Sequence, residues 1–231
     1  MGKNPSATIE IWGDFALWTR PESKVERMTY AVPTPGAIRG LLSSIYSKPP
    51  EFYWQVRRIE VLSPIRYISF KRNEVKSVMK KIPQDNAFKA CILIDEDRTQ
   101  RQSVVLQDVR YRITAEIVPR ETYGHAPGNL MDQFERRVKR GQAFMQPCMG
   151  TREFPAYFEW DSGVCKPIED LTMDLGLMVY DVFNLHKWGV TKQAEPEISL
   201  FHARLEKGVM EIPPYDSPEV LKGGKETGEY A

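Results

Sequence analysis

The sequence has few of the residues from which metal sites and disulfide frameworks are built. Only three histidines and three cysteines are present, and Cys91, Cys148 and Cys165 show no CxxC spacing. We expect these thiols to be reduced, as is typical of a cytoplasmic protein, and not to form a disulfide framework or a zinc site. An HExxH motif, an EF-hand loop, a GxxxxGKS/T phosphate loop and a GxSxG elbow are also missing. The sequence therefore predicts neither a bound metal nor a cofactor.

Long apolar runs are absent as well. No stretch approaches 18 uncharged apolar residues, which argues against a membrane span, and the first six residues lack the apolar core of a secretory signal. With 231 residues, of which 42% are hydrophobic and 11% aromatic, the chain can bury the core of one large domain. We therefore expect a globular, cytoplasmic protein with no membrane partner.

Positive charge is concentrated in the first two thirds of the chain, although the net charge is only +1. Residues 1–152 contain 25 Lys and Arg against 16 Asp and Glu, whereas residues 153–231 contain 7 against 15. A basic surface binds polyanions because each neutralised phosphate releases counterions, although a solvated basic face balanced by the acidic tail gives the same pattern. Aromatic residues among the basic ones, such as Tyr67 and Phe70, favour single-stranded RNA, whose unpaired bases stack on rings.

The hydrophobic pattern predicts alternating strands and helices in the first 160 residues. Thr34-Pro35 is typical of a helix start, because Thr caps the first turn and Pro fits the first helical position. The clearest strand runs from Val105 to Ile117, where apolar and polar side chains alternate. The predicted strands are residues 7–13, 56–62, 65–70, 105–117 and 154–160, and the predicted helices are residues 35–46 and 130–140.

This order of elements predicts an α+β protein with a ferredoxin-like (RNA-recognition-type) βαββαβ domain over residues 1–160. The polar stretch 72–101 is predicted to be a β-hairpin insertion in this domain. Residues 161–231 are predicted to form a small β-rich C-terminal part that ends in a frayed polar tail. Such a domain covers one face of its sheet with helices, so we expect RNA to bind on the open face.

RNA can be cleaved without a metal when a base activates the 2′-hydroxyl, an acid protonates the leaving 5′ oxygen and a cation stabilises the transition state. His125, in a Pro/Gly-rich loop before a basic helix, is a candidate acid or base, although an ordinary loop histidine is the simpler interpretation. His186 and His202 lie in the acidic part, where a structural role is favoured. Tyr46 ends the first helix near Lys48, and it either seals the edge of the core or faces a scissile phosphate.

Several runs of residues match a known family in the same order. The runs are Ile9–Glu22, Thr34–Leu42, Phe134–Arg137 and Gln146–Glu159, and a weaker match continues through Pro213–Glu219. On these runs the chain resembles the Cas-five family of CRISPR-associated proteins, in particular the variant of type I-C Cascade. A match this long and ordered is more specific than a single short motif.

The resemblance implies a ferredoxin-like domain that binds the 5′ handle of CRISPR RNA in Cascade, beside the backbone subunits and the large subunit. It also implies cleavage of the repeat stem-loop of precursor RNA without a metal, by a tyrosine that matches Tyr46 and by a Lys-His pair just before the second helix. Asn129-Leu130 replaces that pair here and supplies neither a cation nor a proton shuttle. Gly40 is implied as a point where the RNA backbone approaches the helix closely, although helix packing alone also explains a glycine there.

Two functions are therefore predicted. The first is a metal-independent endoribonuclease that cuts the repeat stem-loop and keeps the 5′ handle, with Tyr46 and His125 as catalytic residues and Lys139 or Arg140 as a source of charge. The alternative is a non-catalytic subunit that binds the handle and helps Cascade to assemble. A generic RNA-recognition domain, the third interpretation, would be indifferent to the repeat sequence. The expected RNA-binding residues are Arg39, Gly40, Lys48, Arg57, Arg58, Arg66, Lys71, Arg72, Arg110, Arg136, Arg137, Lys139, Arg140 and Arg152.

Overall fold

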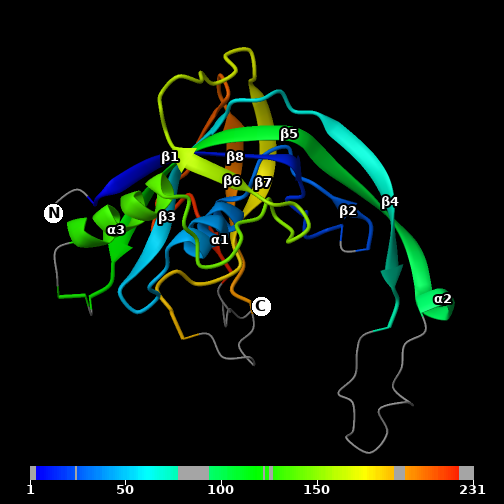
Figure 1. The fold of residues 1–231 in the computed structure, drawn as a ribbon, viewed down its shortest axis with the longest axis horizontal. Coiled ribbons are helices and arrows are strands. Elements are labelled where there is room, and N and C mark those ends of the chain that lie inside the picture. The colour runs from blue at the N-terminus through cyan, green and yellow to red at the C-terminus, as the bar shows by residue number, and fades with distance from the viewer. Residues whose placement is uncertain are drawn as a thin grey trace, which may run out of the picture.

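The computed structural model describes residues 4–23, 25–77, 94–121, 123–124, 127–189 and 196–223. They form a mixed α/β fold of mostly antiparallel sheets with few helices, in agreement with the predicted α+β class (Figure 1). Within these ranges no helix is long and apolar enough to cross a membrane. The helices are α1 (Pro35–Ile45), α2 (Ile94–Asp97) and α3 (Gly128–Lys139), and the strands are β1 (Ser6–Ala16), β2 (Arg27–Met28), β3 (Phe52–Val61), β4 (Tyr67–Val75), β5 (Arg98–Pro119), β6 (Tyr157–Trp160), β7 (Met173–Asp181), β8 (Ser199–Leu205), β9 (Val209–Glu211) and β10 (Leu221–Lys222).

The larger sheet is built around β5, which pairs antiparallel with β1 on one side and with β3 on the other. Ile9, Ile113 and Ile59 lie opposite one another across these three strands, and all three are buried. β6 pairs with β1 and β9 with β3, so the strand order is β6-β1-β5-β3-β9, while β2 and β4 pair with the outer part of β5. The alternation predicted for residues 105–117 is therefore confirmed as one buried and one more polar face.

Both long helices pack on the same face of this sheet. Phe52 and Trp54 are two residues apart on β3, so their side chains point to one face. The ring of Trp54 lies 4.6 Å from that of Phe134 in α3, and the ring of Phe52 lies 5.5 Å from that of Tyr46 at the end of α1. Thr34 caps α1 by accepting the N–H of Ala37 at 3.2 Å, as its hydroxyl predicts. Both predicted helices are confirmed to within two residues at each end.

A long two-stranded arm, formed by β4 and the outer half of β5, projects from the body of the molecule (Figure 1). Its pairing runs from Tyr67 opposite Leu106 to Val75 opposite Arg98. The arm contains the two described ends of the predicted insertion, and residues 78–93 lie outside the described residues. The strand predicted for residues 65–70 continues to Val75, because ladder hydrogen bonds extend it where apolar alternation has stopped.

The second sheet has the order β10-β8-β7 and packs against α1. The approach is close at Gly36, where an added Cβ atom would lie 3.0 Å from the carbonyl oxygen of Tyr180, so a larger residue would push the two segments apart. Apolar residues of both sheets belong to one buried cluster, and β9 from the C-terminal part pairs with β3 of the larger sheet. Because the parts before and after residue 160 share a core and a sheet, the predicted domain boundary there stays a prediction.

Buried tyrosines make the stability of this fold sensitive to alkali. Tyr180 accepts a hydrogen bond from Gln55 Nε2 at 2.6 Å and donates one to the Pro213 carbonyl at 3.0 Å, and burial raises its pKa to about 12. A tyrosine in the unfolded chain ionises near about pH 10, so above that pH the unfolded state binds fewer protons than the folded state. For this residue we expect the free energy of unfolding to fall by up to about 1.4 kcal/mol per pH unit between about pH 10 and 12.

Urea titrations at several pH values across that window measure the slope. Tyr180→Phe removes the titrating hydroxyl and should show a shallower dependence on pH, whatever its effect on stability at neutral pH. Equal slopes for the two proteins would contradict the assignment to Tyr180.

Candidate functional site

Tyr46, the predicted catalytic tyrosine, is the residue that ends α1. Its N–H donates to the Leu42 carbonyl at 2.9 Å, and its own carbonyl accepts the indole N–H of Trp54 at 2.9 Å. Its ring stacks on Phe52, and only 2% of the residue is exposed. The packing that seals the edge of the core therefore also holds the hydroxyl in one place.

The hydroxyl of Tyr46 points toward α3. It donates a hydrogen bond to Oε1 of Gln133 at 2.8 Å, and the guanidinium of Arg137, one helical turn further on, lies 5.7 Å from the centre of the Tyr46 ring. Burial raises the pKa of Tyr46, and the nearby ammonium of Lys48 offsets only part of that shift. At neutral pH the side chain of Tyr46 is therefore a neutral hydroxyl, and not a phenolate base.

Eight of the thirteen predicted RNA-binding cations form ion pairs with carboxylates. Each of these charges is partly neutralised before any phosphate arrives. The pairs are Arg39 with Asp181, Lys48 with Glu51, Arg57 with Glu116, Arg58 with Glu211, Arg66 with Asp108, Arg72 with Glu153, Arg110 with Glu10 and Glu159, and Lys139 with Glu135.

The other five have no carboxylate partner among the described residues, and all but Lys71 lie on α3 or shortly after it. Arg137 is held in place without losing its charge, because its guanidinium stacks 4.1 Å from the centre of the Phe144 ring. Of these cations, Arg137 is the one that the structure places beside Tyr46. The members of this set, called the α3 cation group below, are Arg136, Arg137, Arg140 and Arg152.

A groove of about 560 Å³ runs along the exposed side of α1 and brings Gly40 and Arg152 together. Its other wall is the loop after α3, which is fastened to α1 because the N–H groups of Phe144 and Met145 both donate to the Ser44 carbonyl, at 2.8 and 3.2 Å. A Cβ atom added to Gly40 would meet nothing within 4 Å, so packing does not explain this glycine. The helix surface is therefore open here.

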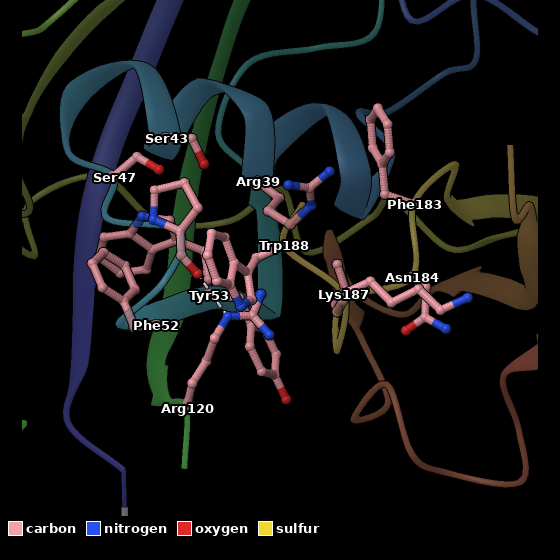
Figure 2. Close-up of a pocket in the computed structure, with 13 residues that line it drawn as sticks. Arg39, Ser43, Ser47, Phe52, Tyr53, Arg120, Phe183, Asn184, Lys187 and Trp188 are labelled. Carbon is pink, nitrogen blue, oxygen red and sulfur yellow. Dashed lines mark hydrogen bonds between the residues drawn. The ribbon is translucent and has the colours of Figure 1, made fainter. Parts of the chain in front are cut away.

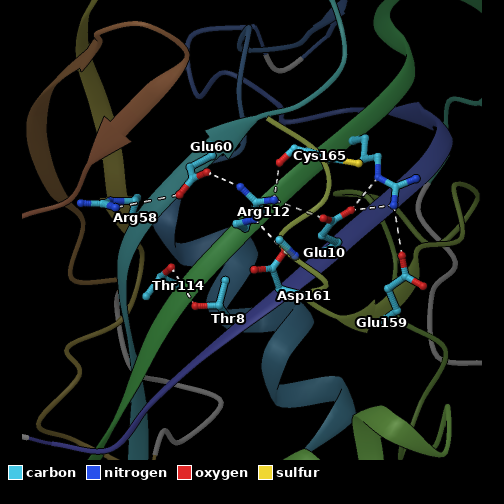
Figure 3. Close-up of polar contacts among 11 residues, drawn as sticks. Thr8, Glu10, Arg58, Glu60, Arg112, Thr114, Glu159, Asp161 and Cys165 are labelled. Atoms are coloured by element: carbon cyan, nitrogen blue, oxygen red, sulfur yellow. Dashed lines mark hydrogen bonds and ion pairs between the residues drawn. The ribbon is translucent and has the colours of Figure 1, made fainter. Parts of the chain in front are cut away.

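The sheet face opposite the helices contains a network of ion pairs (Figure 3). At its centre Arg112, which is 9% exposed, donates to Glu60 at 2.8 Å and to Asp161 at 2.7 Å, and a third carboxylate, that of Glu10, lies 3.4 Å away. Burial alone would lower the pKa of Arg112, but its hydrogen bonds to Asp161 and Glu60 raise it. Arg110 beside it is paired with Glu10 as well. The expected basic surface is therefore not found at the centre of this face.

Within the described ranges, no group of three or more His, Cys, Asp or Glu side chains could hold a metal ion. His125 lies outside the described residues, so Tyr46 is the predicted catalytic residue whose surroundings are known.

Known proteins share both the sequence and the fold. The family model described as "CRISPR-associated protein (Cas_Cas5)" matches residues 8–222. The chain belongs to the Cas5 family. It is 39% identical over 228 residues to the CRISPR pre-crRNA endoribonuclease Cas5d of Mannheimia succiniciproducens, covering 93% of this chain and 97% of the relative. It is 38% identical over 221 residues to the protein of the same name from Thermus thermophilus, covering 89% and 90%.

Two solved structures resemble this Cas5 chain in fold. One is a crystal structure of a CRISPR-associated protein, with a TM-score of 0.66 and 20% identity, covering 95% of this chain and 98% of the other. The second is a functionally uncharacterized protein from Streptococcus mutans, with a TM-score of 0.63 and 20% identity, covering 94% and 97%. The family predicted from the sequence is thus confirmed, and the structures add the likeness in fold.

Asn129 and Leu130, where this Cas5 chain departs from the expected Lys-His pair, both lie in the first turn of α3. Leu130 is 1% exposed and belongs to the core, so this position has joined the apolar face of the helix. Asn129 is exposed and lies four residues before Gln133, hence on the same helix face as the partner of Tyr46. The position of the missing lysine therefore faces the site, and that of the missing histidine faces the core.

Gln133 is a site residue that the sequence analysis missed. Helical spacing offered a signal, because Asn129, Gln133 and Arg137 recur every four residues and so share one face of α3. That this face meets the end of α1 follows only from the tertiary packing.

Proposed function

We propose that this Cas5 protein is an endoribonuclease that cleaves precursor CRISPR RNA in its repeat and stays bound to the 5′ handle. The observation that carries the proposal is the match of almost the whole chain, at 39% and 38% identity, to two proteins named CRISPR pre-crRNA endoribonuclease Cas5d. The position of Tyr46 supports it, because a fixed neutral hydroxyl lies beside an amide and a guanidinium that has no carboxylate partner among the described residues.

A ferredoxin-like domain is part of the proposal. Its support is the antiparallel order β6-β1-β5-β3, with α1 between β1 and β3 along the chain and α3 between β5 and β6. On this view β2, β9 and the arm are additions, and the division into residues 1–160 and 161–231 follows the end of β6.

The proposed reaction is a transesterification within the RNA. The 2′ oxygen attacks the adjacent phosphorus, the bond from phosphorus to the 5′ oxygen breaks, and the products end in a 2′,3′-cyclic phosphate and a 5′-hydroxyl. One proton leaves the 2′-hydroxyl and one is delivered to the 5′ oxygen, and His125 remains the proposed proton carrier.

Tyr46 and Arg137 have separate roles in this reaction. Because Tyr46 donates its proton to Gln133, the lone pairs of its oxygen are free to accept a hydrogen bond from the 2′-hydroxyl and orient it. Arg137 supplies the positive charge that the transition state requires, in place of the lysine that Asn129 has replaced. Lys139 is a poorer source of charge, since Glu135 binds it.

The α3 cation group and the groove at Gly40 form the proposed RNA surface. They lie on one connected part of the molecule, because Met145 lines the groove and its neighbour Phe144 stacks on Arg137. Lys71 on the arm offers a further free charge among the described residues. The eight paired cations are proposed as secondary contacts, since each must exchange a carboxylate for a phosphate.

A second function is favoured by one specific observation, the burial of Leu130 in the core. A chain without the Lys-His pair and without a substitute for it would bind the 5′ handle and assemble with the backbone and large subunits of Cascade, but would not cut. Both functions place the protein in the cytoplasm, where the free thiols of Cys148 and Cys165 stay reduced.

Incubation of the purified protein with its repeat RNA in excess EDTA separates the two functions. We expect cleavage at the base of the stem-loop, unchanged by EDTA, with a 2′,3′-cyclic phosphate on the upstream product. An unrelated hairpin of equal length is the matched control and should remain intact. Intact repeat RNA that is nevertheless bound tightly would establish the non-catalytic function instead.

A further inference from the structure

A second cavity, of about 310 Å³, lies between α1 and the segment that follows β7 (Figure 2). Its lining comes from α1, the start of β3, the residue after β5 and residues 183–188, so distant parts of the chain meet there. This volume is at the small end of the range for ligand sites. None of the residues predicted to bind RNA except Arg39 lines it.

One guanidinium at this cavity has no carboxylate partner among the described residues. Arg120 donates from Nε to the Pro49 carbonyl at 2.7 Å and from Nη1 to the His186 carbonyl at 2.9 Å, and it lies 5.3 Å from the centre of the Tyr53 ring. Burial lowers the pKa of Arg120, yet an arginine remains charged at neutral pH. Two backbone carbonyls thus fix a positive charge at the wall of a cavity.

The other two cations of the cavity are already neutralised. Arg39 binds Asp181 through two hydrogen bonds, and Lys187 binds Glu197. The cavity therefore has one uncompensated positive charge, which matches the single negative charge of one phosphodiester group.

Aromatic rings and free hydroxyls line the rest of the cavity. Trp188 is 53% exposed, which is unusual for so large a ring, and Tyr53 lines the same cavity. Ser43 and Ser47 face it from α1 and from just after its end (Figure 2), and their hydroxyls have no hydrogen-bond partner within the described ranges. A flat, apolar surface with hydroxyls nearby suits a nucleobase, which has two stacking faces and a polar edge.

The cavity adjoins the proposed cleavage site. Phe52 lines it and also stacks on Tyr46, and Ser47 is the residue directly after Tyr46. If a phosphate of the RNA lies at Tyr46, a neighbouring nucleotide can therefore reach the cavity.

We propose that this cavity binds one unpaired nucleotide of the RNA, with its base against Trp188 and Tyr53 and its phosphate at Arg120. The proposal rests on the proposed function, since it names a subsite for the same RNA. It predicts that the protein reads an unpaired nucleotide beside the stem and not the stem alone.

Abasic substitution of the repeat RNA, one unpaired position at a time, tests the proposal in combination with Trp188→Ala. For the unaltered protein we expect one position at which the abasic RNA binds about tenfold more weakly. Trp188→Ala should bind the natural RNA more weakly by a similar factor. The abasic change at that position should not weaken its binding further. Trp188 is exposed, so its loss should leave the fold intact, which a thermal unfolding curve verifies.

Tyr157→Ala is the matched control, because Tyr157 is similarly exposed but does not line the cavity. It should keep the full penalty for the abasic RNA. If Trp188→Ala and the abasic change weakened binding additively at every position, the proposed subsite would be wrong. If the unaltered protein neither bound nor cut repeat RNA, the proposed function itself would fail, and the two failures are therefore distinct.

Discussion

Replacing Tyr46 with Phe is expected to slow cleavage of repeat RNA by about a hundredfold or more, while RNA affinity changes by less than about threefold. The substitution keeps the ring that stacks on Phe52 and lies under the guanidinium of Arg137. It removes only the hydroxyl that Gln133 holds and that, in the proposed reaction, orients the 2′-hydroxyl. A loss confined mainly to the rate is therefore the signature of chemistry, because one hydrogen bond to the 2′-hydroxyl contributes little to the affinity for a whole RNA but orients the attacking group.

Single-turnover rates with saturating protein, together with a filter-binding titration, measure the two quantities separately. Tyr157→Phe removes an exposed hydroxyl elsewhere and should cleave at the unaltered rate. Gln133→Met provides a check on the hydrogen bond: if Gln133 acts through Tyr46, its effect should vanish in a protein that already contains Tyr46→Phe. An unchanged rate for Tyr46→Phe would remove Tyr46 from the mechanism.

Replacing Arg112 with Met is expected to destabilise the fold by about 3–5 kcal/mol, the largest effect on stability that we anticipate. Glu10 is fully buried beside Arg112, and the guanidinium of Arg112 donates hydrogen bonds to Glu60 and Asp161. Without the guanidinium these carboxylates would repel one another in a region of low dielectric constant, where breaking a buried ion pair is costly. Strands β1 and β3 and the segment 161–165 would each lose their contact with the guanidinium on β5.

Urea unfolding at neutral pH measures this loss. Arg58→Met is the matched control on the same face, since its pair with Glu211 is exposed, its contact with Glu60 is long at 4.0 Å, and the two should contribute less than about 1 kcal/mol. In the Arg112→Met protein the penalty should shrink as the pH falls toward about 4, because protonation removes the repulsion. A penalty no larger than that of Arg58→Met would show that the network is not a source of stability.

In the wild-type protein, by contrast, acid weakens this network and lowers the stability of the fold. Burial alone would raise the pKa of Asp161, but the hydrogen bonds from Arg112 and from the N–H of Gly163 hold it below its usual range. A depressed carboxylate pKa means stability that is present above the unfolded pKa of about 3.9 and is lost as the pH falls through the folded value.

Local patterns in the sequence predicted the elements that local chemistry determines. The cap at Thr34 and the apolar spacing behind it gave α1, and the alternation from Val105 to Ile117 gave the inner half of β5. The end of β4 and the start of β5 fall in the stretch 72–101 that was predicted to be a β-hairpin insertion, but their bounds as strands were not predicted, because an arm that is held mainly by its own ladder needs no apolar alternation. The pattern therefore stops where burial stops, although the strand continues.

The site was only partly predictable, because it depends on contacts between distant segments. The place of Tyr46 at the end of α1 and the loss of the Lys-His pair at Asn129-Leu130 are visible along the chain. The contact of Tyr46 with Gln133 spans 87 residues and follows from how α3 lies beside α1. The pairing of Arg112 with Glu60 and Asp161 likewise joins three segments, so a row of arginines on β5 suggested a basic face that the fold neutralises.

The continuity of β5 has a mechanical consequence. β5 runs from the arm into the middle of the larger sheet, its inner half pairs with β1 and β3, and the left-handed backbone of Asp108 (φ 52°) lies where the arm meets the sheet. A force on the arm therefore acts on the same backbone that organises the core, and Asp108 is the point at which that backbone changes conformation. Lengthening the arm by pairs of residues, by contrast, would change its reach while leaving the inner register untouched.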